Sequence, residues 1–387
     1  MDFNLEQYSK KINKSSAAAK LIENITQLCE KINKDRINLM EVCGTHTHEI
    51  FKSGVKAMLP KKIKLRSGPG CPVCVTPDSY IDGAVNMAKD KNFIITTFGD
   101  MLKVPGSVSS LKAEQNAGAD VRVIYSPAET LDIAAENPYK SVVFLSVGFE
   151  TTVPASAFLI KAADERKLDN IYIYEANKTV PEAILAIARH PQVKIDGFIL
   201  PGHVSVIIGA DAYKSAAAES KIPGVVCGFE YIDILLAINS LLTLIYEKKP
   251  DIVNDYPRVV SAAGNRMAQS AIAEVFEACD AEWRGIGVLN GTGLRLRDKY
   301  IKYSAEKKFG SIIFSGARAG GCNAAGAGVN SGCRCGEVLL SLIEPPECPM
   351  FASVCNPVNP VGPCMVSSEG VCAAYYKYGA AGADIEI

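Results

Sequence analysis

Four cysteines near the end of the chain have the residue type and the surroundings of iron–sulfur ligands. They are Cys335, Cys348, Cys355 and Cys372, separated by 12, 6 and 16 residues. Gly and Pro are so frequent around them that regular helices and strands are not expected there, and a metal centre would hold such a segment together. Thiolates are the usual ligands of iron–sulfur clusters, but a four-thiolate zinc site or ordinary buried thiols fit the same spacing. Further thiols lie nearby at Cys322, Cys333 and Cys364.

Two more thiols belong to a Cys-x-x-Cys motif. Cys71 and Cys74 directly follow the segment SGPG (67–70), where we expect a helix to begin. The spacing brings two sulfurs within reach of a disulfide, and the partial positive charge of a helix N-terminus favours the thiolate. The motif therefore predicts thiol–disulfide exchange. Half of a zinc site and a pair of inert capping cysteines remain as alternatives.

One thiol and two imidazoles share a short loop, EVCGTHTHE (41–49). Cys43, His46 and His48 lie within six residues, and the chain has four histidines in all. Thiolate plus imidazole is a good ligand set for ferrous iron or zinc. We predict a metal site formed by the thiol and the imidazoles of this loop. The alternatives are a zinc site shared with the Cys-x-x-Cys motif, and polar residues without a ligand.

Two weaker motifs contain groups that can transfer a proton. Glu150 lies in GFETT (148–152) and His203 lies in PGHVS (201–205). Either side chain can act as an acid or base or orient a ligand by a hydrogen bond, and Glu150 can equally be a carboxylate that stabilises a helix N-terminus. The sequence contains no Walker-type phosphate loop and no serine nucleophile elbow, so neither phosphate nor serine-hydrolase chemistry is predicted.

Short apolar strands come before most of these motifs. Residues 37–40 lead into the Cys43 loop, 141–147 into GFETT, and 196–200 into PGHVS. Further strands are expected at 93–97, 121–125, 171–174 and 225–227. Strands that alternate with helices indicate βαβ units and parallel sheets, in which ligands bind beyond the carboxyl ends of the strands.

The chain also contains a degenerate internal repeat. The similar pairs are LMEVCGTHTHEIF (39–51) with FLSVGFETTVPASAF (144–158), SGPGCPVCVTPDSY (67–80) with ILPGHVSVIIGADAY (199–213), and ITTFGDML (95–102) with VVCGFEYIDIL (225–235). Three pairs in the same order predict an α/β fold with two similar, duplicated βαβ domains, plus a Cys/Gly/Pro-rich iron–sulfur domain. The expected divisions are an N-terminal helical segment that packs on the C-terminal part (1–38), α/β domain I (39–140), α/β domain II (141–257) and the iron–sulfur domain (258–387).

The composition excludes several classes of protein. The 387 residues include 41 basic and 42 acidic side chains, so the net charge is −1 and no basic surface for a nucleic acid is expected. The sequence begins without an apolar signal core, and its longest apolar stretch, 232–246, is too short to span a bilayer. We therefore expect a cytoplasmic protein with no membrane and no nucleic-acid partner. In that compartment thiols stay reduced, so the 13 cysteines indicate metal or redox chemistry.

Together, the motifs resemble the HypD family of hydrogenase maturation proteins, which help to build the Fe(CN)2CO group of nickel–iron hydrogenases. The matching segments are CGTHTHEI (43–50), GPGCPVCVTP (68–77), GFETT (148–152), PGHVS (201–205), CRCGEVL (333–339) and PVGPCMVSSEGVCAAYYKY (360–378). They occur over nearly the whole chain, and their joint order is very specific.

The resemblance implies two similar α/β domains, a third portion that carries a 4Fe–4S cluster, a small chaperone partner, HypC, and a cyanide donor, HypE. It implies that Cys43 is an iron ligand shared with a cysteine of HypC and that His46 supports it as a ligand or an acid–base group. It also implies that Cys71 and Cys74 form a redox dithiol. The implied cluster ligands are Cys335, Cys348, Cys355 and Cys372, with Cys364 as an alternative fourth ligand.

The resulting hypothesis is a redox-active scaffold that assembles a metal centre. Iron(II) at Cys43, in a cleft between domains, would receive cyanide and carbon monoxide, with Glu150 and His203 as supporting groups. The cluster would pass electrons one at a time to the dithiol, which handles two. Whether such a scaffold is an enzyme is a matter of definition, since it acts once per assembled centre. The alternatives are an iron–sulfur thiol–disulfide oxidoreductase acting on a small molecule or a protein disulfide, and a structural zinc protein.

Overall fold

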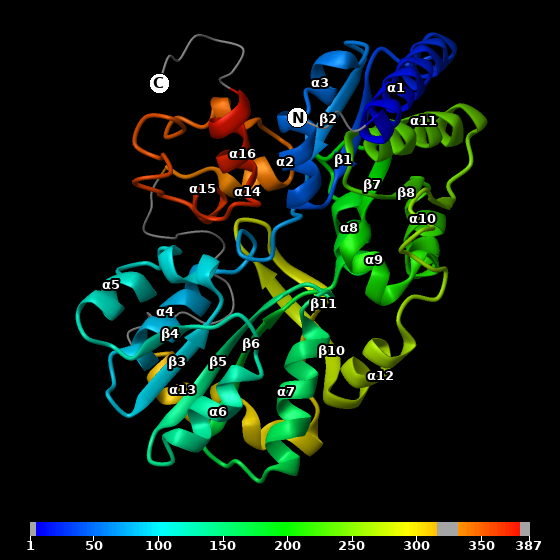
Figure 1. The fold of residues 1–387 in the computed structure, drawn as a ribbon. Coiled ribbons are helices and arrows are strands. Elements are labelled where there is room, and N and C mark those ends of the chain that lie inside the picture. Colours follow the sequence, from blue (N-terminus) through cyan, green and yellow to red (C-terminus); the bar gives the residue numbers. More distant parts are fainter. Residues whose placement is uncertain (1–4, 316–331, 380–387) are drawn as a thin grey trace.

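Two parallel β-sheets form the centre of the protein (Figure 1). The computed structural model describes residues 5–315 and 332–379, with side chains from residue 16 onward. The larger sheet has the strand order β2-β1-β7-β8-β9 and the smaller sheet has the order β4-β3-β5-β6. The strands of the larger sheet are β1 (Ile37–Glu41), β2 (Ile63–Ser67), β7 (Gly197–Pro201), β8 (Gly224–Cys227) and β9 (Ile252–Asn254). The strands of the smaller sheet are β3 (Phe93–Thr97), β4 (Val121–Val123), β5 (Ser141–Gly148) and β6 (Ile171–Asn177).

Helices connect successive strands and cover the faces of both sheets, which confirms the predicted α/β class. In chain order up to β9 they are α2 (Gly44–Lys52), α3 (Val55–Met58), α4 (Asp78–Ala88), η1 (Gly99–Lys103), α5 (Leu111–Asn116), α6 (Glu129–Glu136), α7 (Val153–Glu165), α8 (Val180–Ala188), α9 (Gly202–Ile208), η2 (Ala210–Tyr213), α10 (Lys214–Ser220) and α11 (Tyr231–Glu247). The strands that they cover are buried along most of their length, as parallel strands with helices on both faces must be. No helix within the described ranges is long and apolar enough to cross a membrane.

Each sheet combines strands from both of the predicted α/β domains. Strands β1 and β2 pair with β7, β8 and β9, whereas β3 and β4 pair with β5 and β6. The divisions 39–140 and 141–257 therefore do not correspond to separate sheets, because the chain crosses from one sheet to the other after β2 and again after β6. Strands β1, β2, β3 and β4 can be taken as the equivalents of β5, β6, β7 and β8. With this correspondence, the order β2-β1-β7-β8 of the larger sheet becomes β6-β5-β3-β4, which is the order of the smaller sheet. The two repeats have exchanged their second halves.

This match also tests the three similar sequence pairs. The pair that begins at residues 39 and 144 joins β1 with β5, which occupy equivalent places in the two sheets. The other two pairs join β2 with β7 and β3 with β8, which do not. Their similarity has a local cause, because several parallel strands here end in a glycine-containing loop before the next helix.

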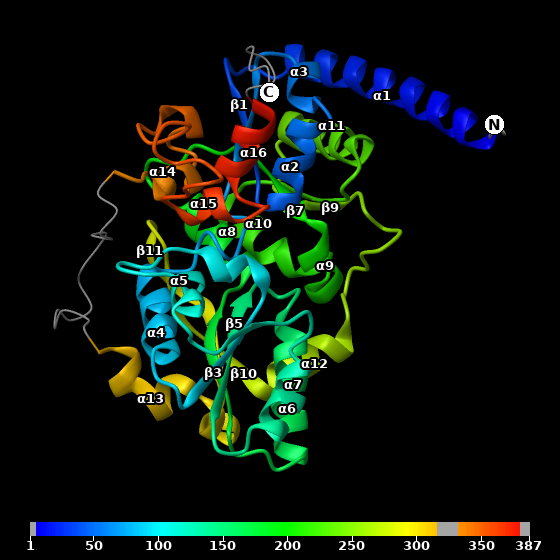
Figure 2. The ribbon, with the colours of Figure 1, turned by 60° about the vertical axis from the view of Figure 1, so that its left-hand side comes forward.

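The long N-terminal helix α1 (Leu5–Lys31) lies across one end of the larger sheet (Figure 2). Ile25 and Cys29 are buried in one apolar cluster with Ile238 and Leu241 of α11. The expectation that residues 1–38 pack on the C-terminal part is corrected by this contact. The reason is that α11 offers an apolar face long enough to cover the apolar stripe of α1.

The C-terminal range 258–387 divides into two parts. The first part packs along the smaller sheet and consists of α12 (Arg266–Val275), the antiparallel hairpin of β10 (Phe276–Trp283) and β11 (Gly287–Leu296), η3 (Asp298–Tyr303) and α13 (Ala305–Ile313). The second part lies beside α2, and its described residues, 332–379, form the short helices α14 (Cys335–Leu339), η4 (Pro345–Glu347), α15 (Pro363–Val366) and α16 (Val371–Tyr378). The range expected to form one domain is thus divided in the structure, since 266–313 has ordinary helix and strand patterns. Cys322 lies outside the described residues.

Candidate functional site

Cys43 lies directly beyond the carboxyl end of β1, at the start of α2. Its side chain is buried, and this burial is the main reason why the pKa of the thiol rises to about 12; the charges of Glu369 and Glu41 act in the same direction. Gly70 packs so closely on the Cys43 backbone that a Cβ at residue 70 would lie 2.2 Å from the Cys43 nitrogen. Glycine is therefore required at this position, and the SGPG segment brings the Cys-x-x-Cys motif beside the Cys43 loop.

His46 is fully buried in the first turn of α2. Its Nε2 lies 2.9 Å from the carbonyl oxygen of Gly228, which can only accept a hydrogen bond, so Nε2 carries the proton and Nδ1 carries the lone pair. Nδ1 is buried and has no hydrogen-bond partner among the described residues. Burial lowers the pKa of His46 to about 4, so the imidazole is neutral at pH 7. This is the form that can bind a metal or accept a proton.

An aromatic ring lies between the two predicted imidazoles. Phe229 stacks on His46 and on His203, with ring centroids 4.9 and 4.0 Å apart. Tyr256 meets Phe229 edge-on, and a Cβ added at Gly202 would lie 3.1 Å from both rings. His203 is exposed, whereas His46 is buried. The structure thus brings both histidines together beyond the carboxyl ends of β1, β7 and β8.

Glu150 lies beyond the carboxyl end of β5 and forms no hydrogen bond with either imidazole in the described part of the chain. Its Oε1 accepts a hydrogen bond of 2.9 Å from the backbone N–H of Val180, and its Oε2 has no hydrogen-bond partner within residues 5–315 and 332–379. Burial raises the pKa of Glu150 to about 8. Burial also raises the pKa of Tyr213, and the charges of Glu150 and Cys43 raise it further.

Cys71 and Cys74 are buried where the Cys43 loop meets the C-terminal region. The backbone N–H of Cys74 lies 3.4 Å from Sγ of Cys71. The motif was expected at a helix N-terminus, but α4 begins only at Asp78, because a turn and Pro77 come between. The expected effect of a helix dipole is therefore absent, and burial instead raises the pKa of Cys74 well above its usual range.

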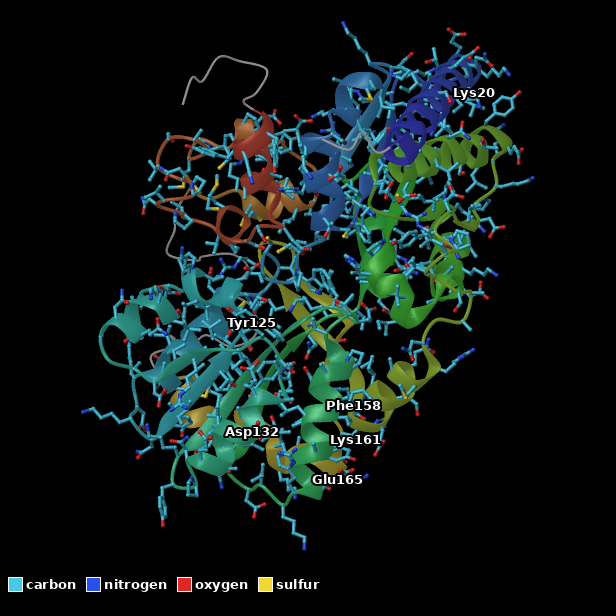
Figure 3. All side chains as sticks on the ribbon, in the orientation of Figure 1. Lys20, Tyr125, Asp132, Phe158, Lys161 and Glu165 are labelled. Atoms are coloured by element: carbon cyan, nitrogen blue, oxygen red, sulfur yellow. The ribbon has the colours of Figure 1, made fainter. Side chains whose placement is uncertain are left out.

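Six cysteines line one small cavity in the C-terminal region, where Figure 3 shows sulfur atoms gathered among α14, α15 and α16. They are Cys333, Cys335, Cys348, Cys355, Cys364 and Cys372. The set includes all four predicted cluster ligands and the alternative ligand. Apolar side chains complete the lining, so the donors are soft thiols in a dry environment, which suits an iron–sulfur cluster. In the described ranges, no three His, Cys, Asp or Glu side chains are arranged to hold a single metal ion.

Cys364 connects this cavity with the Cys-x-x-Cys motif. Its thiol interacts with two others: Cys335 lowers its pKa and Cys74 raises it, and the net shift is well above the usual range. The Cys372 thiol instead lies among Cys335, Cys333 and the two remaining predicted ligands, whose charges add to burial in raising its pKa. A continuous row of thiols therefore runs from the dithiol to the cavity.

The turn between β10 and β11 fixes the C-terminal region against the same motif. Arg284 is almost fully buried, donates from Nε to the carbonyl oxygen of Thr76 at 2.8 Å and pairs with Asp78. The next residue, Gly285, packs on Gly336, where a Cβ would lie 2.3 Å from the Gly285 carbonyl oxygen. Gly336 directly follows Cys335, so the turn places the first predicted cluster ligand relative to the dithiol.

Sequence reasoning missed several residues of the site. Phe229 and Arg284 carried no chemical signal, since an aromatic ring after a strand and an arginine in a turn are common. Glu369 accepts a hydrogen bond of 2.9 Å from Oγ1 of Thr45, and Oγ of Ser367 accepts a hydrogen bond of 3.3 Å from the thiol of Cys71. Both residues lie in the segment PVGPCMVSSEGVCAAYYKY (360–378), which also contains predicted cysteine ligands. Their place in this motif could have identified them as candidate site residues.

Comparison with known proteins gives a consistent result over the whole chain. The family model described as "HypD: Hydrogenase formation hypA family" matches residues 16–379. "Hydrogenase maturation factor HypD" of Rhodobacter capsulatus is 40% identical over 379 residues, which cover 97% of this chain and 99% of that protein. The protein of the same name from Escherichia coli (strain K12) is 42% identical over 348 residues, 88% of this chain and 89% of that protein. The one from Rhizobium leguminosarum bv. viciae is 40% identical over 381 residues, 96% of each.

Proposed function

The chain belongs to the HypD family of hydrogenase maturation factors, and from this premise we propose that it is the redox-active scaffold on which an Fe(CN)2CO group is assembled. In this proposal the iron complex is the cargo, a HypC-type chaperone shares it, and a HypE-type protein donates cyanide. The observation that carries the proposal is the meeting of three kinds of group in one region: a Cys–His pair, a dithiol and a cavity lined by six cysteines.

Cys43 and His46 are the proposed site of the cargo iron. The buried thiol has a pKa of about 12 when free, so it becomes a thiolate only when a cation or a proton acceptor compensates its charge. The unpartnered Nδ1 of His46 can bind the metal directly or accept the thiol proton, because its Nε2 is already hydrogen-bonded to Gly228. The exposed imidazole of His203 gives the same site a second acid–base group at the surface.

Cys71 and Cys74 are the proposed source of electrons for the release of cyanide. A thiocyanate on a carrier sulfur needs two electrons and two protons to become the carrier thiol and hydrogen cyanide. Oxidation of two thiols to one disulfide supplies two electrons and two protons, so the exchange balances. The close approach of the Cys71 sulfur and the Cys74 backbone supports this role, since the two sulfurs belong to one tight turn.

The cavity of cysteines is the proposed 4Fe–4S site. Cys335, Cys348, Cys355 and Cys372 would hold the cluster, which supplies single electrons when bound. The position of Cys372 among the other cavity thiols supports it as the fourth ligand. Cys364 contacts Cys74 and lies between the dithiol and the cavity, which supports a connecting role rather than a place in the ligand set.

Infrared spectroscopy of the complex with a HypC-type chaperone tests the iron site. Cys43→Ala should abolish the Fe–CN and Fe–CO bands, because the thiolate that holds the cargo is lost. Cys29→Ala is the matched control, since Cys29 is also buried but packs on α11. It should keep the bands. Bands that persist in Cys43→Ala would overturn the assignment of iron to this residue.

Anaerobic purification tests the cluster and separates it from zinc. A cluster makes the protein brown, with absorption near 400 nm (roughly, from thiolate-to-iron charge transfer), whereas a structural zinc protein is colourless. Cys355→Ala should bleach this colour and Cys71→Ala should not. A colourless, zinc-loaded protein would refute the cluster, and multiple turnover of a disulfide substrate without any chaperone would favour a plain oxidoreductase.

A further inference from the structure

A hydrogen-bonded chain leads from the buried dithiol to the surface. The Cys71 thiol donates to Oγ of Ser367 at 3.3 Å, and that hydroxyl donates to Oδ2 of Asp100 at 3.2 Å. Cys71 is 3% exposed and Ser367 is 1% exposed, whereas Asp100 lies exposed in the first turn of η1. This hydrogen-bonded chain therefore begins at an almost fully buried thiol and ends at an exposed carboxylate.

We propose that Ser367 and Asp100 form the path by which the proton of Cys71 leaves and re-enters the protein. This inference rests on the redox role proposed for the dithiol and adds two residues to it. When two thiols become a disulfide, two electrons and two protons leave. A buried thiol cannot pass its proton to bulk water directly, so a polar group must take it at the sulfur.

The hydroxyl of Ser367 is held in one orientation that suits such a transfer. It accepts from the Cys71 thiol and from the backbone N–H of Glu369 at 3.2 Å, and it donates its own proton to Asp100. A hydroxyl has one donor and two acceptor positions, so all three are used. Both hydrogen bonds are therefore donated in the direction of the carboxylate, from Cys71 to Ser367 and from Ser367 to Asp100. A proton can thus move to the carboxylate while the hydroxyl is protonated again from the sulfur.

The three members come from different parts of the fold. Asp100 belongs to η1 at the edge of the smaller sheet, Cys71 follows β2 of the larger sheet, and Ser367 follows α15 in the C-terminal region. No helix or turn requires these contacts locally. Their alignment therefore depends on the way in which the three parts pack, which supports a role for the chain beyond capping a turn.

The test measures oxidation of the dithiol in the full-length reduced protein under anaerobic conditions. A dipyridyl disulfide serves as oxidant, samples are quenched with acid, and mass spectrometry of the alkylated peptide with Cys71 and Cys74 gives the rate. The variants are Ser367→Ala and Asp100→Asn. The matched controls are Ser368→Ala, which changes the exposed neighbouring serine, and Asp298→Asn, which changes an exposed aspartate in the first turn of η3.

Both test variants should slow oxidation about tenfold or more, as expected when a positioned proton acceptor is removed, and both controls should stay near the wild-type rate. Ser367→Thr keeps the hydroxyl and should restore the rate, and added formate should rescue Asp100→Asn, whose site is open to solvent. Wild-type rates in Ser367→Ala and Asp100→Asn would overturn the proposal, and so would a slow rate that neither threonine nor formate restores.

The assay uses no iron, HypC-type chaperone or cyanide donor. A failure of the proton path would therefore leave the scaffold proposal intact. A failure of the scaffold proposal would appear elsewhere, as infrared bands that survive Cys43→Ala or Cys71→Ala.

Discussion

Replacement of Glu150 by glutamine should remove part of the pH dependence of stability. The carboxyl is 5% exposed and accepts a hydrogen bond from the backbone N–H of Val180, while its second oxygen has no partner in the part of the chain that the structure describes. Burial is the largest cause of its raised pKa. Glutamine keeps the size and the accepting oxygen but cannot ionise. The substitution therefore separates the effect of the charge from the effect of packing.

The magnitude follows from the difference between the folded and unfolded pKa. The pKa rises from 4.5 to about 8, a difference of 3.5 units, which corresponds to about 5 kcal/mol at 1.36 kcal/mol per unit. Between these values the folded protein binds more protons than the unfolded chain, so the free energy of unfolding falls as the pH rises. His46 has the opposite sign, but its pKa lies at about 4 instead of 6.5, so its effect is confined to lower pH. Glu150 alone should then account for a loss of about 1 to 2 kcal/mol between pH 6.5 and 8.

Urea unfolding at several pH values between 6.5 and 8 measures this loss. Trp283 is the only tryptophan, is 1% exposed and stacks on Phe149, so its fluorescence reports on this region. The wild-type free energy of unfolding should fall more steeply with pH than that of Glu150→Gln, by about 1 to 2 kcal/mol over the interval. Glu136→Gln changes an exposed glutamate of α6 and should behave like the wild type. Equal slopes in wild type and Glu150→Gln would refute the reasoning.

Three further substitutions give distinct outcomes. Gly336→Ala places a Cβ 2.3 Å from a backbone oxygen and should cause loss of the 400 nm absorption expected of the cluster (roughly), whereas unchanged absorption would contradict the packing of the turn. Phe229→Leu should shift the imidazole protons of His203 downfield in NMR spectra, because the stacked ring is removed; unchanged shifts would argue against the stack. Arg258→Met leaves the buried Asp233 without its cation and should lower the free energy of unfolding by about 2 kcal/mol, less than for a fully buried pair because the arginine is half exposed; no loss in urea titrations would contradict this.

Local sequence patterns predicted the strands and the loops that follow them, but not which strands pair. Every strand expected from an apolar run is present, because burial of a parallel strand on both faces leaves a clear mark in the sequence. The exchange of halves between the two repeats leaves no such mark. Pairing depends on where the chain crosses after β2 and after β6, and both crossings look like ordinary strand-to-helix connections.

The candidate site shows the same division. Cys43 and His46, the Cys-x-x-Cys pair and the cavity cysteines could be singled out from the sequence by residue type and spacing, and their roles stay predictions. Their environment could not be predicted, because it depends on tertiary contacts. The pKa of Cys74 is raised by burial instead of lowered by a helix, and the partner of Cys71 is a serine almost 300 residues away in sequence. The prediction for residues 1–38 failed for a similar reason. The apolar stripe of α1 does not show by itself whether it packs on α11, as it does, or on the C-terminal part.

The exchange of halves explains why the Cys-x-x-Cys pair lies beside both the Cys43 loop and the C-terminal cysteines. The first crossing of the chain, after β2, begins with the segment that contains Cys71 and Cys74. Because it leaves the larger sheet at the carboxyl end of a strand, it passes beside the Cys43 loop, where Gly70 touches the backbone. The C-terminal region then covers this crossing, with Cys364 against Cys74 on one side and Ser367 against Cys71 on the other.

Each sulfur of the pair thus faces a different route: Cys74 faces the row of thiols, and Cys71 faces the hydroxyl and carboxylate. Under the proposed function electrons and protons would reach the pair by separate routes, so a variant at Ser367 should slow the chemistry of the dithiol without changing the colour of the cluster.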